Sequence, residues 1–103
     1  MAQVYHKGDN ICIARAISGV GWKDMPLWEY DITLTIRGMC SGDEYTFTKK
    51  SEDMIIDDDT DSVWVFLDST KTKGMSGLYF CQCEIGYNKQ TLYTNNIEIV
   101  EII

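Results

Sequence analysis

The stretch Tyr30-Asp31-Ile32-Thr33-Leu34-Thr35-Ile36-Arg37 alternates without a break between apolar or aromatic residues and polar ones. Successive side chains of a β-strand point to opposite faces, so a period of two is typical of a strand with one buried face. The even-numbered side chains should therefore face a core, and the odd-numbered ones should face solvent. Threonine in the outward positions suits a pleated surface. The period that recurs along the chain is this one and not the helical one, which predicts an all-β protein.

Short segments with the same character lie on both sides of this stretch, separated by turn residues. They predict strands at residues 3–6, 11–17, 45–48, 54–56, 63–67 and 78–85, and one or two last strands over residues 91–103. Asn95-Asn96 predicts a bulge or kink in the last segment, and residues 71–75 fit a single helical turn. Turn signals about every ten residues favour an antiparallel sandwich or barrel. We predict one domain over residues 1–103.

Two of these segments have apolar side chains on both faces. In residues 11–17 almost every side chain is small or apolar, which predicts that most of this strand is buried on both sides. Arg15 is the exception, and we expect it to reach solvent near the strand end or to meet a carboxylate. Residues 63–67 predict a central strand, with Trp64 and Phe66 on the face opposite the other three side chains.

The charge balance disfavours some classes of partner. Asp and Glu outnumber Lys and Arg by 16 to 9, which gives a formal net charge of −7. Nucleic-acid phosphates and anionic membrane surfaces bind clustered Lys and Arg, so we expect neither as a partner. The opening residues lack the basic and apolar regions of a secretory signal, and no apolar run is long enough to span a membrane. We expect a soluble protein that is made in a cytoplasm.

The cysteines predict core filling and no metal site. Cys81 and Cys83 alternate within a strand, so both thiols should point into the core, whereas zinc usually takes pairs that are two to four residues apart in a turn. Cys12 and Cys40 lie elsewhere, and a cytoplasmic protein should keep all four thiols reduced. The single histidine, His6, should lie at the surface of an edge strand.

No set of residues predicts a reaction. The acidic run from Asp57 to Asp61 lacks the glycine and the terminal glutamate of an EF-hand loop, so we interpret it as a solvated turn, with calcium binding as the alternative. Glycine-rich phosphate loops and Gly-x-Ser-x-Gly are absent from the sequence. We therefore predict a protein that is not an enzyme and that uses no metal or cofactor.

The loop around Pro26 supplies the candidate interface. Exposed aromatic and aliphatic side chains can anchor a partner, and each would contribute on the order of 1.5–3 kcal/mol if it were buried there. The alternative is that the same side chains close the end of the domain's own core. The predicted interface residues are Trp22, Met25, Leu27 and Trp28.

Ser76-Gly77-Leu78-Tyr79-Phe80-Cys81 resembles the strand of immunoglobulin variable-type domains that holds the tyrosine corner and the second cysteine. Met75 stands where that motif has aspartate. The resemblance implies an immunoglobulin-like antiparallel β-sandwich of seven to eight strands. It also implies that Cys12 is the first cysteine, able to bridge to Cys81, and that Trp22 or Trp28 is the core tryptophan. Our own expectation is four free thiols.

A second resemblance covers most of the chain. Gly8-Asp9 after a first strand, Met25-Pro26-Leu27 before the alternating strand, Gly77-Leu78-Tyr79 and the closing Asn96-Ile97-Glu98-Ile99 resemble small β-sandwich domains of tailed-bacteriophage virion proteins. These include the N-terminal domains of baseplate upper proteins and related tail or head-fibre modules. Such domains work by packing and docking, so no residue of known function transfers.

This second resemblance implies a bacteriophage virion structural or adaptor protein, made in the host cytoplasm and located in the virion. Its expected partners are other virion proteins or further copies of itself, since virions are built by symmetry. The alternative function is an immunoglobulin-like binding module that recognises a protein or a glycan through Trp22 and Trp28. A small enzyme is a third class, for which no constellation of residues argues.

Overall fold

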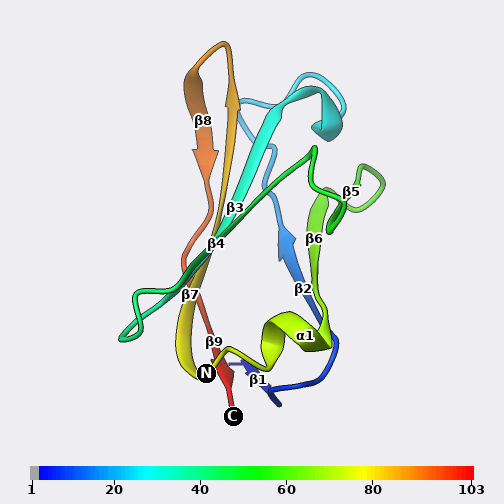
Figure 1. The fold of residues 1–103 in the computed structure, drawn as a ribbon. Coiled ribbons are helices and arrows are strands. Elements are labelled where there is room, and N and C mark those ends of the chain that lie inside the picture. The colour runs from blue at the N-terminus through cyan, green and yellow to red at the C-terminus, as the bar shows by residue number, and fades with distance from the viewer. Residues whose placement is uncertain (1–2) are drawn as a thin grey trace.

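The computed structural model describes residues 3–103 and is all-β, with 52% strand and 7% helix (Figure 1). Within these residues the chain forms nine strands, one short α-helix and one 3-10 turn. In chain order they are β1 (Gln3–Tyr5), β2 (Ile11–Ala16), η1 (Leu27–Glu29), β3 (Asp31–Gly38), β4 (Glu44–Thr48), β5 (Met54–Asp57), β6 (Ser62–Leu67), α1 (Ser69–Thr72), β7 (Gly77–Tyr87), β8 (Gln90–Thr94) and β9 (Glu98–Ile102).

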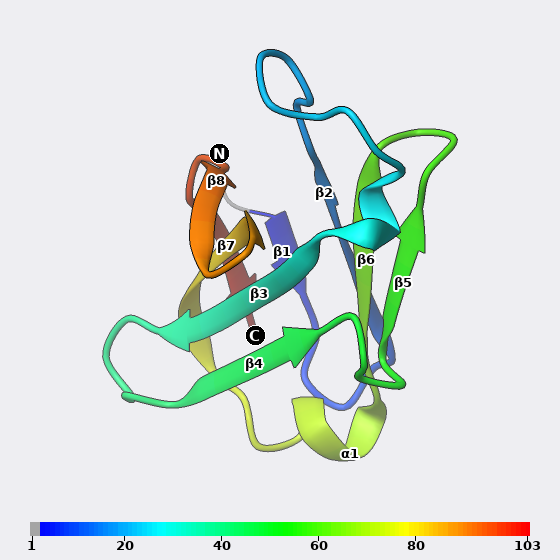
Figure 2. The ribbon, with the colours of Figure 1, turned by 90° about the horizontal axis from the view of Figure 1, so that it is seen from above.

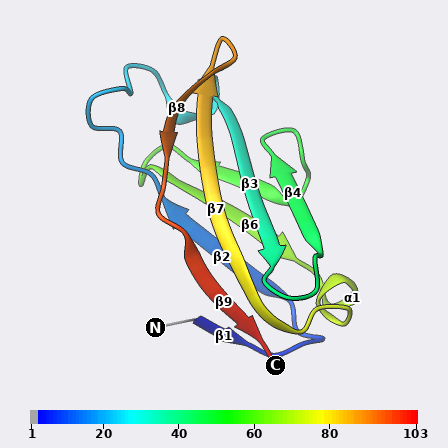
Figure 3. The same ribbon diagram turned by 90° about the vertical axis from the view of Figure 1, so that its left-hand side faces the viewer.

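The larger sheet has the strand order β1-β9-β7-β3-β4, with β8 also paired to β7. Figure 3 shows β8 and β9 following one another along the same side of the long strand β7. Between them the chain leaves the ladder at residues 95–97, where the sequence predicts a kink. The Asn95 side-chain oxygen accepts a hydrogen bond of 2.8 Å from the Cys83 N–H and fills this gap.

The smaller sheet has the order β2-β6-β5, with β6 as its central strand. Helix α1 follows β6 and lies at the same end of the molecule as the C-terminus (Figure 1). It begins two residues earlier than the predicted turn, because the Asp68 side chain caps it by accepting a 2.8 Å hydrogen bond from the Lys71 N–H.

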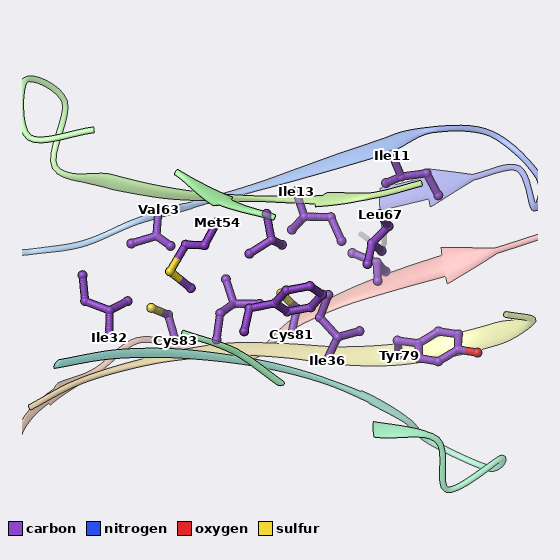
Figure 4. Close-up of a cluster of buried hydrophobic side chains, with 14 of the residues drawn as sticks. Ile11, Ile13, Ile32, Ile36, Met54, Val63, Leu67, Tyr79, Cys81 and Cys83 are labelled. Carbon is purple, nitrogen blue, oxygen red and sulfur yellow. The ribbon is translucent and has the colours of Figure 1, made fainter. Parts of the chain in front are cut away.

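The core lies between the two sheets, which pack face to face (Figures 2 and 4). The alternation predicted for β3 is confirmed: its even-numbered side chains are buried and its odd-numbered ones are not. Cys81 and Cys83 are fully buried among these side chains, as predicted. Figure 4 shows side chains from both sheets meeting in this layer: Ile11, Ile13, Met54, Val63 and Leu67 from one, and Ile32, Ile36, Tyr79, Cys81 and Cys83 from the other.

The antiparallel prediction is wrong for one strand pair. β1 runs parallel to β9, with Gln3 opposite Val100 and Tyr5 opposite Ile102. β1 and β2 are consecutive but lie in different sheets, so β1 cannot form a hairpin with β2 and instead pairs with the open edge of β9. The nine strands between residues 3 and 103 also exceed the seven to eight that the sequence predicts.

The prediction that residues 11–17 are buried on both faces is wrong as well. Ile11 and Ile13 point into the core, but Ala14 and Ala16 are exposed. The reason is architectural, because the larger sheet covers only one face of the smaller sheet. In residues 3–103 no helix or strand lies over the other face.

Candidate docking surfaces

The loop from β2 to β3 is tied to the acidic turn between β5 and β6. The Ile17 N–H donates to the Asp61 carbonyl oxygen at 2.8 Å, and the Lys23 ammonium lies 2.7 Å from the Asp61 carboxylate. The Leu27 N–H donates to the Asp58 carboxylate. Hydrogen bonding to Asp61 raises the pKa of Lys23. The acidic run is therefore a turn that anchors a neighbouring loop through its carboxylates.

The structure separates the four residues predicted to form the interface. Leu27 is fully buried in the domain's own core, so its assignment to an interface is wrong: η1 turns its side chain inward. Met25 and Trp22 are half-buried against the core. The Trp22 ring stacks on Tyr93 with centroids 5.6 Å apart, and its Nε1–H donates to the Ser18 carbonyl oxygen at 2.6 Å. These three residues mainly close the end of the core.

Trp28 is the member of the set that faces solvent. Its side chain is 57% exposed, and the Lys49 ammonium lies 5.8 Å from the centroid of its ring. The same ammonium donates to the Trp28 carbonyl oxygen at 3.0 Å. Val20, at the tip of the same loop, is 88% exposed. Trp28 and Val20 are thus the large apolar side chains of this loop that are exposed.

A larger apolar surface lies on the outer side of the smaller sheet. We call it the small-sheet face, and it consists of Cys12, Ala14, Ala16, Ile55, Trp64 and Phe66. Its large side chains are well exposed: Ile55 by 52%, Trp64 by 38% and Phe66 by 40%. The sequence places Trp64 and Phe66 on the face opposite Val63, which the structure confirms. The exposure of that face was missed, because an apolar strand face is usually a buried one.

Hydrogen-bonded register brings these side chains together. Trp64 lies opposite Ala14 on one side and Ile55 on the other, which makes a fully apolar row across the sheet. Phe66 lies opposite Cys12 in the next row. Register partners on one face have Cβ atoms about 5 Å apart, so the rows form a continuous patch.

Two open hollows flank Phe66 on this face. One, of about 470 Å³, is lined by Ile55, Ile56, Trp64, Phe66 and the carboxylates at positions 57–59. The other, of about 380 Å³, is lined by Asn10, Ile11, Cys12, Asp53, Phe66, Leu67 and Asp68. The apolar patch therefore has an acidic rim at both ends.

The outer face of the larger sheet is less continuous. Around β3 it presents Thr33, Thr35 and charged residues, as predicted. Near β1 and β9 it exposes Val4, Leu78 and Ile99, but Glu101 stands between Leu78 and Val4 in the register. A charged residue in the middle lowers the apolar area that a partner can bury there.

The residue types that bind metals or act as nucleophiles are dispersed. His6 is exposed, as predicted, and within residues 3–103 no group of three or more His, Cys, Asp or Glu side chains is placed to hold a metal ion. Burial raises the pKa of Cys81 to about 11 and that of Cys83 to about 12, so both stay protonated near neutral pH. Cys12 points away from Cys81, onto the opposite side of its sheet.

Arg15 lies at the seam between β2 and β9. Its guanidinium pairs with the Glu98 carboxylate and donates to the Asn96 carbonyl oxygen. Of the two predicted positions for Arg15, the structure shows the one with a carboxylate partner. An open hollow of about 610 Å³ beside it is lined by polar and apolar groups of β2, β8, β9 and the segment 95–97.

None of the helical segments in residues 3–103 has the length and apolar character of a membrane span. Comparison of the chain with protein-family models gives no match, and comparison with curated proteins gives none either.

Proposed function

We propose that this domain is an immunoglobulin-like sandwich that acts as a non-enzymatic docking module of a larger assembly. The strand order supports the fold assignment: β2-β6-β5 faces β9-β7-β3-β4, and β1 pairs in parallel with the last strand. Tyr79 supports it as well. Its hydroxyl accepts a hydrogen bond from the Ser76 N–H, and it lies two residues before Cys81, as in a tyrosine corner.

Two features of immunoglobulin domains are replaced in this chain. Cys12 lies on the outer face of its strand, so Ile11 and Ile13 occupy the inward positions where a bridging cysteine would stand. Neither Trp22 nor Trp28 lies on β3, and the aliphatic side chains of Ile32, Leu34 and Ile36 fill the core there. Apolar packing thus takes the place of the bridge and the tryptophan.

The observation that carries the docking function is the small-sheet face. A monomer normally covers large apolar side chains or scatters them singly, and contiguous exposed patches usually mark interaction sites. Here Ile55, Trp64 and Phe66 adjoin one another on a regular sheet. Aromatic residues at the centre of such a patch are the type that dominates binding energy at interfaces.

The resemblance to domains of bacteriophage virion proteins suggests which kind of assembly the domain docks into. We place the protein, in this proposal, in a bacteriophage head, tail or baseplate, where its partners are other virion proteins. A small rigid sheet domain with an uncovered apolar face suits that role, because docking requires shape and surface and no reaction centre. The domain then contributes one face to the assembly and keeps the polar threonine face of β3 toward solvent.

The test compares how the protein fractionates with assemblies in the cells or particles that produce it. The wild type should elute in a high-mass species on size-exclusion chromatography, and the double variant Ile55→Thr, Phe66→Thr should elute as a free domain. Ile97→Thr, at an exposed apolar position between β8 and β9, is the matched control and should behave as wild type. If both variants remain in the high-mass species, the small-sheet face is not the docking surface.

A second candidate is a binding module that uses the loop from β2 to β3, around Pro26. The observation in its favour is the exposure of Trp28 and Val20 at the loop tip. In this case Trp28→Ala should abolish the binding of a protein or glycan and leave the fold unchanged. The small-sheet face is preferred because it places three large apolar side chains together.

A further inference from the structure

The small-sheet face differs in charge from an ordinary apolar patch, and this difference points to the chemistry of its partner. We propose that the face binds a basic segment of another protein, with large apolar side chains at its centre and Lys or Arg at its ends. The inference rests on the proposed docking function and adds the partner class.

The apolar centre of the small-sheet face indicates that the partner carries large apolar side chains. Ala14, Trp64 and Ile55 form one row across the sheet, and Phe66 adjoins it between two hollows. The hollows, of about 470 and 380 Å³, are large enough for aliphatic or aromatic side chains. A segment that places one apolar side chain on each side of Phe66 would fill both.

The acidic rim of the small-sheet face indicates that the partner also carries positive charge. Asp53, which directly precedes the edge strand β5, and Asp57, the last residue of that strand, stand two residues before and after Ile55, so all three share the outer face. Asp58 and Asp59 continue the rim at one end, and Asp68 continues it at the other. From residue 53 to residue 68 the chain contains six aspartates and no lysine or arginine.

Basic groups of this domain neutralise only part of the rim. Among the described residues, Lys71 lies 3.7 Å from Asp53, and Lys23 pairs with Asp61 in the turn. Arg15, the basic residue of β2, is paired with Glu98 at the opposite seam. Asp57, Asp59 and Asp68 have no ion-pair partner among the described residues. Asp58 accepts a hydrogen bond from the Leu27 N–H and lies near Lys23. The three unpaired carboxylates therefore complement Lys and Arg from a partner.

The same rim argues against a second copy as the occupant. In a two-fold symmetric contact the face would pack against itself. With strands antiparallel, the Asp57–Asp59 end of one copy meets the Asp53 and Asp68 end of the other. With strands parallel, the Asp57–Asp59 turns of the two copies approach each other directly. Like charges that meet at an interface oppose association, so a basic partner is favoured.

The probes are two synthetic nine-residue peptides, one alternating Leu and Lys and the other alternating Leu and Glu. Binding to the full chain is measured by fluorescence anisotropy at low and high salt. Iodoacetamide modification, followed by mass spectrometry, reports the site, because Cys12 lies opposite Phe66 on the face whereas the exposed Cys40 lies in the β3–β4 turn. The Leu–Lys peptide should bind, weaken with salt and protect Cys12 but not Cys40.

Variants separate the apolar and the charged contributions. Ile55→Thr with Phe66→Thr should weaken Leu–Lys binding by about tenfold or more. Asp57→Asn with Asp59→Asn should weaken it roughly fivefold and reduce its salt dependence. The matched control, Asp31→Asn with Glu44→Gln, removes two carboxylates from the larger sheet and should change little.

Several results would overturn the proposal. Equal or tighter binding of the Leu–Glu peptide, or no binding of either peptide, would reject a basic partner. Equal weakening by the control pair, or no protection of Cys12, would show diffuse charge attraction elsewhere on the chain. A dimer in sedimentation that Phe66→Thr dissociates would make a second copy the occupant. In each case the docking function itself is judged separately, by the fractionation of the Ile55→Thr, Phe66→Thr variant.

Discussion

The hydroxyl of Tyr79 accepts a hydrogen bond of 3.0 Å from the backbone N–H of Ser76, three residues earlier in the chain. Tyr79 is fully buried at the start of β7, so this bond fixes the connection from α1 into the longest strand of the larger sheet. The Tyr79 ring therefore packs in the core, and its hydroxyl holds the backbone where the chain enters β7.

Tyr79→Phe should lower the free energy of unfolding by about 0.5–1.5 kcal/mol, the usual net contribution of one hydrogen bond. Chemical denaturation followed by circular dichroism measures it. Tyr45→Phe is the control and should cost less, since Tyr45 is half-buried and its hydroxyl makes no hydrogen bond within residues 3–103. Equal costs for the two variants would mean that the bond to Ser76 adds nothing.

Substitutions in the β2–β3 loop around Pro26 should show which of its side chains stabilise the core and which lie at the surface. Leu27→Ala should cost about 2–5 kcal/mol, because it opens a cavity in the core. Trp22→Ala should lower the melting temperature by several degrees, since it removes the stack on Tyr93 and the bond to Ser18. Trp28→Ala should leave the melting temperature unchanged. A large fall for Trp28→Ala would contradict its surface position.

Much of the fold could be predicted from the sequence where one strand face is buried and the other is polar. The alternation of residues 30–37 sets both the strand and its orientation, because a one-residue slip would turn Ile32 and Leu34 to solvent. Cys81 and Cys83 follow the same logic. The parallel pairing of β1 with β9 could not be predicted, since it joins the first and last strands, which are far apart in the sequence.

The candidate site could be predicted only in part. Trp28 is exposed, as an interface residue must be, but Leu27, two residues after the half-buried Met25, turns inward at η1. The small-sheet face was missed because Ala14, Ala16, Trp64 and Phe66 look like core residues. Sequence periodicity shows which side chains share a face of a strand, but it does not show whether another layer covers that face.

The state of the cysteines gives a simple prediction. Titration under denaturing, non-reducing conditions should find four thiols per chain. In the native protein Cys40 should react first and Cys12 more slowly, while the buried Cys81 and Cys83 should react only after unfolding. Two thiols under denaturing conditions would instead support a bridge between Cys12 and Cys81.

The buried thiols also predict a loss of stability in alkali. Burial raises the pKa of Cys81 to about 11 and that of Cys83 to about 12, from an ordinary value of 9.0. The unfolded chain therefore loses these protons at lower pH than the folded one, so their contribution is complete below pH 9.0 and declines as the pH rises through about 11 to 12.

Urea denaturation with a reductant, from pH 8 to 10.5, measures this dependence. The free energy of unfolding of the wild type should fall with pH above about 9, and that of Cys81→Ala with Cys83→Ala should fall less steeply. The double variant starts from a lower stability, so the slope is the quantity to compare. Identical slopes would show that the two thiols do not titrate with unfolding.

The central claim is that the small-sheet face, and not the threonine face of β3, contacts the partner. A photo-cross-linking phenylalanine analogue placed at position 66, and in a second protein at position 35, tests it most directly in the source that makes the protein. We expect irradiation to cross-link position 66 to another protein, which mass spectrometry identifies, and to leave position 35 uncross-linked. Cross-links from position 35 alone, or from neither position, would contradict the account.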